Sequence, residues 1–175
     1  MTVRQGRRGR PVAGAGAAAA LPGVLQDMRL LWALVHALQK TSKRMRQTLG
    51  VTGPQRLVIR VLGLLPGSSA GDLAAMLHVH PSTLTGVLAR LVDQRYITRT
   101  PDPDDRRRSV LLLTRRGSQV NARLDGTAES SVSRALRRLT DRERQNFRVA
   151  LSELTDALEL PARGRTPGRR TNVRR

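Results

Sequence analysis

The sequence contains no cysteine among its 175 residues, which excludes disulfides, thiolate metal sites and cysteine-based redox sensing. Its only aromatic side chains are Trp32, Tyr96 and Phe147, too few for the stacking platforms that grip RNA or single strands. No apolar run approaches the roughly 18 residues that span a bilayer. The Ala- and Gly-rich start of the chain lacks the large apolar residues of a secretion signal. We therefore expect a cytoplasmic, nucleoid-associated protein.

Acidic residues are scarce relative to basic ones. Lys and Arg number 32 against 13 Asp and Glu, which gives a formal net charge of +19. An excess of this size indicates a polyanionic partner, either nucleic acid or an anionic membrane surface. Because the aromatic platforms for single strands are lacking, the composition favours double-stranded DNA.

Ten of the arginines lie in two end segments, residues 1–20 and 161–175, which contain no acidic residue and no periodic apolar pattern. This composition predicts disordered basic tails. Taking these ten from the 32 leaves 22 basic against 13 acidic residues, so the domain expected over residues 21–160 is basic in its own right. Within it we expect a DNA-binding lobe over about residues 52–113, with dimerisation helices over about 24–49 and 114–159.

Apolar spacing predicts a mainly α (α+β) fold with six helices and one β-hairpin. The first helix has one continuous apolar stripe and ends at Gly50. Thr52, Ser69, Thr114 and Thr140 occupy positions typical of helix caps. The helices are expected over about residues 24–49, 53–65, 72–77, 82–94, 114–139 and 141–159, and the strands over 96–100 and 109–113.

The third and fourth expected helices are short and joined by a tight turn. Such a helix-turn-helix lifts its second helix so that it fits a major groove, which is about 12 Å wide. Small hydroxyl residues at the start of that helix allow close approach to bases, and Arg90 can reach a phosphate or a guanine edge. The candidate contacts are Ser82, Thr83, Thr85, Gly86 and Arg90. The alternative is an ordinary polar helix face with Ser82 as a cap.

The expected hairpin carries three consecutive arginines at its tip, Arg106, Arg107 and Arg108. Because three adjacent positive charges repel one another, we expect the cluster to have a function. The concentrated negative potential of a DNA minor groove would attract these arginines. Asp105 is close enough in sequence to hold the Arg107 guanidinium by a salt bridge. The alternative is a solvated run of charge.

These residues resemble the MarR family of bacterial transcription regulators. Asp105-x-Arg107-x-x-x-Leu111-x-Leu113-Thr114 is similar to the family's wing signature, and the preceding Pro101-Asp102-Pro103-Asp104 to its neck. Thr114-Arg115-Arg116-Gly117, Ser82-Thr83-Leu84-Thr85 and Arg90-Leu91 are similar to the family's helix entry and recognition helix. Gly86 departs from the larger polar or basic residue of many relatives.

The resemblance, over roughly residues 24–160, implies a winged helix-turn-helix with six helices and a two-stranded wing. Its terminal helices would intertwine with those of a second chain in a homodimer. The wing arginine, here Arg107, would enter the minor groove and the recognition helix the adjacent major groove. The family often binds small aromatic effectors between its dimer helices and its DNA-binding lobe. Met28, Trp32 and His36, one turn apart, are candidates for such a pocket, with core packing as the alternative.

Other chemistry has little support in the sequence. His78 and His80, with the distant His36, lack the cysteine or carboxylate partners of a metal site, so we expect no metal or cofactor and a turn or helix-cap role for His80. No catalytic triad, phosphate loop or carboxylate pair stands out, so we do not expect an enzyme. The leading hypothesis is a ligand-responsive repressor that binds a pseudo-palindromic operator as a homodimer. The alternatives are an architectural DNA-coating protein with little sequence preference, and a binder of RNA or anionic membranes that would leave the wing without a use.

Overall fold

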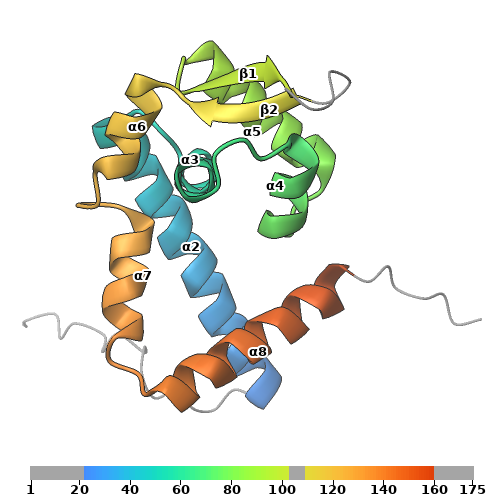
Figure 1. Ribbon diagram of the computed structural model, residues 1–175. Helices are drawn as coiled ribbons and strands as arrows, with labels where there is room; N and C mark the ends of the chain where they lie inside the picture. The colour runs from blue at the N-terminus through green and yellow to red at the C-terminus, as the bar shows by residue number, and fades with distance from the viewer. Residues whose placement is uncertain (1–21, 103–108, 160–175) are drawn as a thin grey trace, which may run out of the picture. The chain divides into compact units, whose positions relative to one another are not determined.

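The computed structural model describes residues 22–102 and 109–159 of the chain. The described residues up to Ala128 form one compact unit, and the described residues from Glu129 onward form a second. No helix in the described ranges is long and apolar enough to cross a membrane. The first unit contains helices α2 (Gly23–Leu49), α3 (Gly53–Leu64), α4 (Ala70–Leu77), α5 (Pro81–Asp93) and α6 (Arg115–Ala122), and strands β1 (Ile97–Pro101) and β2 (Ser109–Leu113) (Figure 1). Helices α7 (Ala128–Leu136) and α8 (Asp141–Glu159) follow.

The expected capping signals start α3 and α4. Thr52 accepts a hydrogen bond from the Gln55 backbone N–H, and the Gln55 side chain accepts one from the Thr52 N–H at 2.9 Å. Ser69 and Asp72 form the same reciprocal pair, with the Ser69 N–H donating to the Asp72 carboxylate at 3.0 Å. Each pair satisfies two of the N–H groups that a helix start leaves unpaired. Local sequence therefore fixes where both helices begin.

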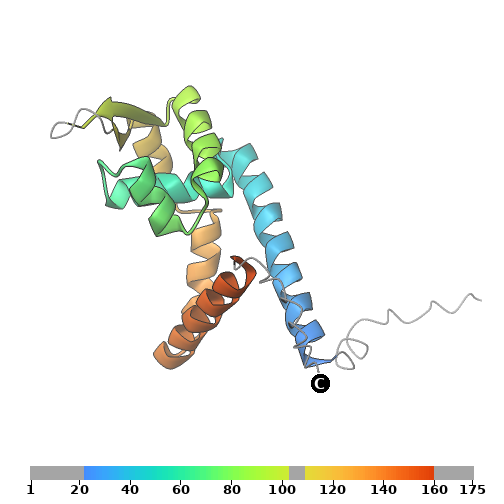
Figure 2. The ribbon, with the colours of Figure 1, turned by 90° about the vertical axis from the view of Figure 1, so that its right-hand side faces the viewer.

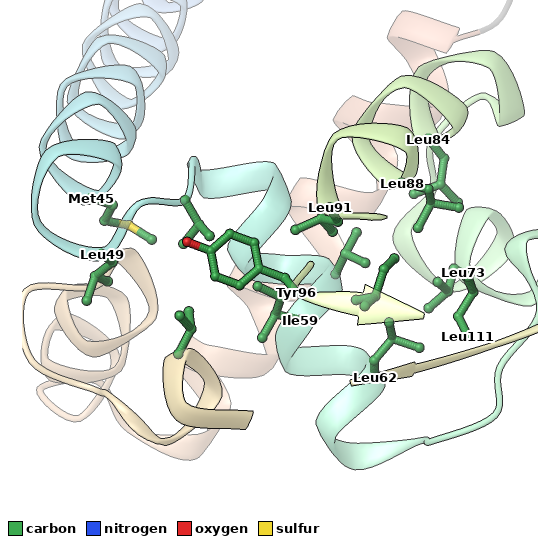
Figure 3. Packing of buried hydrophobic residues seen from close by; sticks show 14 of the residues in the cluster. Met45, Leu49, Ile59, Leu62, Leu73, Leu84, Leu88, Leu91, Tyr96 and Leu111 are labelled. Carbon is green, nitrogen blue, oxygen red and sulfur yellow. The ribbon is translucent and has the colours of Figure 1, made fainter. Parts of the chain in front are cut away.

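One hydrophobic core joins the elements of the first unit (Figure 3). It contains residues from the C-terminal end of α2, from α3, α4 and α5, from both strands and from α6, including Met45, Ile59, Leu73, Leu91, Tyr96, Leu111 and Val120. Strand β1 pairs antiparallel with β2, from Ile97 opposite Leu113 to Pro101 opposite Ser109. The expected winged helix-turn-helix fold is confirmed.

The apolar stripe of α2 is buried near the C-terminal end of the helix and exposed near its N-terminal end. Met45 and Leu49, in its last turns, are buried in the core, whereas Val24, Met28 and Val35, in its first half, are about half exposed or more. That half extends beyond the lobe formed by α3, α4 and α5 (Figure 2). The lobe therefore uses only the end of a stripe that the sequence continues for the whole helix.

The long helix expected over residues 114–139 is broken, so the described residues form seven helices rather than six. Helix α6 ends at Ala122, and α7 begins at Ala128. Between them Gly126 has a φ of +72°, which glycine adopts without strain, and the Thr127 hydroxyl donates to the Leu124 carbonyl at 2.6 Å. This turn replaces the helical hydrogen bonds that the expectation assumed.

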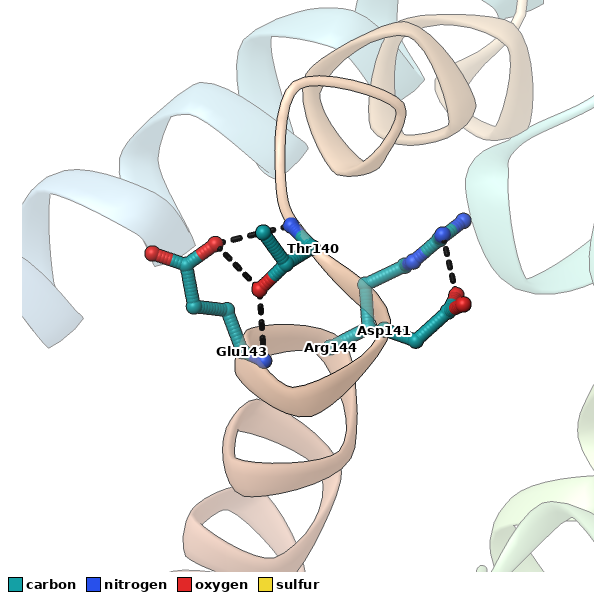
Figure 4. A network of polar contacts seen from close by, with 4 residues as sticks. All are labelled: Thr140, Asp141, Glu143 and Arg144. Atoms are coloured by element: carbon teal, nitrogen blue, oxygen red, sulfur yellow. Dashed lines mark hydrogen bonds and ion pairs between the residues drawn. The ribbon is translucent and has the colours of Figure 1, made fainter.

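In the second unit, the expected capping box starts α8 (Figure 4). The Thr140 N–H and hydroxyl donate to the Glu143 carboxylate at 2.7 and 2.8 Å, and Thr140 accepts from the Glu143 N–H at 3.3 Å. The backbone and side-chain hydrogen bonds from Thr140 lower the pKa of Glu143. Asp141 pairs with Arg144 in the same turn. Neither α7 nor α8 contains a buried residue in the described structure, and Phe147, Leu154 and Leu158 of α8 are exposed.

Candidate DNA-binding surface

The turn between α4 and α5 is built from two histidines. His78 ends α4 in the left-handed conformation, with φ of +49°. His80 caps α5: its Nδ1 accepts from the Ser82 N–H at 3.3 Å and lies 2.7 Å from the Ser82 hydroxyl oxygen. The expected capping role of His80 is therefore confirmed, and the alternative of Ser82 as the cap is wrong. No group of three or more potential metal ligands occurs in the part of the chain that the structure describes.

Helix α5 buries Leu84, Leu88 and Leu91 and leaves every candidate contact exposed. The side chains of Ser82, Thr83 and Thr85 differ in which hydrogen-bonding groups remain available to DNA. Ser82 forms a hydrogen bond with His80, and the Thr85 hydroxyl donates its proton to the Pro81 carbonyl at 2.8 Å, so Thr85 retains only its methyl group and oxygen lone pairs for other contacts. Thr83 has no side-chain hydrogen bond to any described residue. Thr83 thus supplies a free donor and acceptor, and Thr85 a methyl suited to thymine.

Gly86 lies in the exposed interior of α5 with no packing reason to be glycine. A Cβ built there meets nothing within 4 Å. A glycine inside a helix costs about 0.5–1 kcal/mol relative to alanine. No described residue packs against this position, so the bare backbone leaves room for close approach by a molecule outside the chain.

The stem of the wing is held against the turn before α4. The Leu111 N–H donates to the Ser68 carbonyl, and the Gly67 N–H to the Leu111 carbonyl, each at 3.1 Å. Ser69 forms a β-bridge to Val110. These bonds fix the stem relative to the helix-turn-helix. The arginines expected to contact the minor groove, Arg106, Arg107 and Arg108, and Asp105, expected to hold Arg107, lie outside the described residues.

The junction between the wing and α6 explains part of the sequence motif. The Thr114 hydroxyl accepts from the Gly117 N–H at 3.1 Å and donates to the Arg95 carbonyl at 2.7 Å. A Cβ at Gly117 would lie 2.1 Å from the Tyr96 carbonyl oxygen, so only glycine fits there. The Arg116 guanidinium lies 4.5 Å from the centre of the Tyr96 ring. The motif therefore fixes the end of β2 to the end of the recognition helix.

Sequence reasoning missed a polar cluster beneath this junction. Arg56 is 1% exposed and donates to the Val120, Asn121 and Arg123 carbonyls, the last at 2.6 Å. Arg60 donates to the Asn121 side-chain oxygen at 2.8 Å. The available signal was the position of Arg56, one helical turn before the buried Ile59. A polar residue at that spacing faces the core.

The three residues proposed for an effector pocket are exposed in the single chain. Trp32 is 70% and Met28 51% exposed, and His36 is exposed as well. These side chains are not part of the core formed by the described residues of a single chain. The effector pocket stays a prediction.

Comparison with known proteins agrees with this geometry. The sequence model of the MarR family matches residues 49–108, which include α3, the helix-turn-helix and the first strand of the wing. The HTH-type transcriptional repressor Rv2887 of Mycobacterium tuberculosis is 30% identical over 106 residues, 61% of this chain and 76% of that protein. This chain belongs to the MarR family. It is accordingly a non-enzymatic, DNA-binding transcription regulator.

The similar proteins include an activator as well as a repressor. The transcriptional activatory protein BadR of Rhodopseudomonas palustris is 32% identical over 93 residues, 51% of this chain and 53% of that protein. Among solved structures, the PcaV transcriptional regulator of Streptomyces coelicolor, in complex with its natural ligand, is 28% identical with a TM-score of 0.59. That match covers 83% of this chain and 99% of PcaV.

Proposed function

We propose that this MarR-family protein is a ligand-responsive repressor that binds a pseudo-palindromic operator as a homodimer. The observation that carries the proposal is the exposed face of α5, where glycine and small hydroxyl residues stand unpacked beside the stem of an arginine-tipped wing. Ser82, Thr83, Thr85, Gly86 and Arg90 contact the major groove. Arg106, Arg107 and Arg108 contact the adjacent minor groove, with Asp105 holding Arg107 in place.

The exposed apolar surface supports a homodimer. Val24, Met28, Val35 and Leu38 line the free half of α2 at helical spacing, and each is at least 43% exposed. Phe147, Leu154 and Leu158 repeat the pattern on α8. Contiguous apolar surface of this kind marks an interface, and a second copy carries the same stripes. Two copies would present two recognition helices, and half-sites one helical turn apart follow from that symmetry.

Regulation by a small aromatic effector is proposed from two observations. Met28, Trp32 and His36 are exposed one turn apart on the half of α2 assigned to the dimer. The similar PcaV is described with a natural ligand. An effector that binds one spacing of the two lobes better than another shifts the population away from the DNA-binding arrangement. If such a compound releases the parent protein from the operator but does not release the Trp32→Ala variant, the result would support regulation by an effector at this site.

The second candidate function is DNA coating, favoured by the ten arginines of residues 1–20 and 161–175. Two measurements distinguish an operator-binding regulator from a DNA-coating protein. The first is selection from a random duplex library, and the second is titration of selected and random duplexes at about 150 mM salt. The regulator selects a two-fold symmetric motif and prefers it by about a thousandfold or more. Deleting both arginine-rich segments should flatten the salt dependence and keep that preference. A preference below about tenfold in both forms would favour coating.

A further inference from the structure

A shallow groove runs along the flank of the recognition helix that faces the wing. Its volume is about 220 Å³, and Thr85, Leu88, Ala89, Val92 and Asp93 of α5 line one side, with Arg99 of β1 on the other. Figure 1 shows α5 lying beside the hairpin. The groove lies between the element proposed for the major groove and the stem of the element proposed for the minor groove.

Arg99 reaches this groove because of its strand position. Ile97 is buried in the core, and side chains two residues apart in a strand point to the same face, so Arg99 continues the core-facing side beyond the core. Its side chain is exposed and makes no hydrogen bond or ion pair with any other described residue. A guanidinium on a paired strand whose donors contact no described residue is suited to binding an anion.

We propose that this groove seats one sugar–phosphate unit of the DNA strand that separates the two grooves, and that Arg99 binds its phosphate. The inference rests on the proposed two-groove binding. A protein that places a helix in the major groove and a wing in the adjacent minor groove must straddle one backbone strand, and the surface between those elements faces it. Leu88, Ala89 and Val92 give the sugar an apolar wall, and Arg99 gives the phosphate a planar pair of donors.

Asp93 is the one carboxylate in the lining, and it makes no hydrogen bond or ion pair with another described residue. A carboxylate here repels a bound phosphate. Asp93→Asn should therefore tighten DNA binding, whereas Arg99→Ala should weaken it. Equal losses in the two variants would show that the residues act as an internal ion pair, which would overturn the proposal.

The deciding experiment replaces single phosphates of the selected operator by neutral methylphosphonates and measures the affinity of the full-length protein for each duplex. For the parent, we expect one phosphate per half-site, between the major- and minor-groove contacts, whose neutralisation weakens binding about tenfold. In Arg99→Ala that penalty should fall below about twofold. Arg142→Ala, which removes one exposed arginine of α8, should keep it. Circular dichroism checks that the variants fold.

The outcomes separate this inference from the proposed function. If the parent selects no operator, the proposed function fails. If the parent is selective but Arg99→Ala shows the same penalty as the parent at every phosphate, the groove does not seat the backbone, and the two-groove binding stands without it.

Discussion

The guanidinium of Arg56, buried in α3, donates to the carbonyl oxygen of Val120 in the last turn of α6. The last carbonyls of a helix have no partners within it, and the negative end of the helix dipole attracts a cation. Arg56 also reaches the Arg123 carbonyl at 2.6 Å, just before the chain turns toward α7. The arginine thus ties the helix that precedes the helix-turn-helix to the end of α6.

Replacing Arg56 by methionine should destabilise the protein by about 2–4 kcal/mol, because one buried and two partly buried hydrogen bonds to carbonyls at the end of α6 are lost. Chemical denaturation at fixed protein concentration measures the loss. Arg46→Met, at an exposed position of α2, should change stability by less than about 0.5 kcal/mol. Equal stability of the two variants would show that the buried contact contributes nothing.

Val35→Glu should convert the dimer to a monomer. The side chain is 48% exposed in the single chain, so a carboxylate there is tolerated by the fold but not by an apolar interface. Sedimentation at micromolar concentration should show half the parent's mass with native circular dichroism. Leu64→Glu, at a 73% exposed leucine of α3, is the control and should stay dimeric. A monomeric parent at this concentration would contradict the proposed homodimer.

Gly86→Ala should raise stability and lower DNA affinity at once. Alanine gains about 0.5–1 kcal/mol of helix propensity, and its methyl group meets no protein atom within 4 Å. The same methyl group would stand between the helix and the DNA. Gly71→Ala in α4, where a Cβ makes only an ordinary 3.7 Å contact, should stabilise without loss of affinity. Thermal melts and operator titration provide both readouts, and unchanged operator affinity in Gly86→Ala would refute the close approach.

The capping box of α8 should respond to acid. Because hydrogen bonds from Thr140 lower the pKa of Glu143 in the folded state, this carboxylate stabilises the fold above its unfolded pKa. That contribution is lost as the pH falls through the lowered folded pKa. The melting temperature of Glu143→Gln should therefore lie below the parent's at pH 6 and converge with it towards pH 3. Glu153→Gln, at an exposed position of the same helix, should show no such convergence.

The sequence was most informative where local chemistry decides the structure. The Thr52, Ser69, Thr114 and Thr140 caps and the second strand follow from hydrogen bonds among residues close in the chain. The break before α7 depends on Gly126 taking a left-handed turn, which apolar periodicity alone did not reveal.

Features that depend on distant residues escaped prediction. The role of Arg56 depends on carbonyls more than sixty residues away, and the unpaired state of Thr83 depends on what its neighbours bind. The groove at Arg99 arises only when β1 is placed beside α5. Pattern reasoning identified the exposed face of the recognition helix, but not which of its hydroxyls remain available.

The division of labour between the two grooves is tested most directly by titrating the parent, Arg107→Ala and Thr85→Ala against a library of operator variants. Arg107→Ala should weaken binding by about 1–3 kcal/mol and relax preference mainly at flanking A·T-rich positions, where groove width and potential are read. Thr85→Ala should change preference at inner half-site positions, with a smaller effect on the salt dependence. Asp105→Ala should partly reproduce the Arg107→Ala loss. If Arg107→Ala binds the operator as tightly as the parent at moderate salt, the wing does not read the minor groove and the account is wrong at its centre.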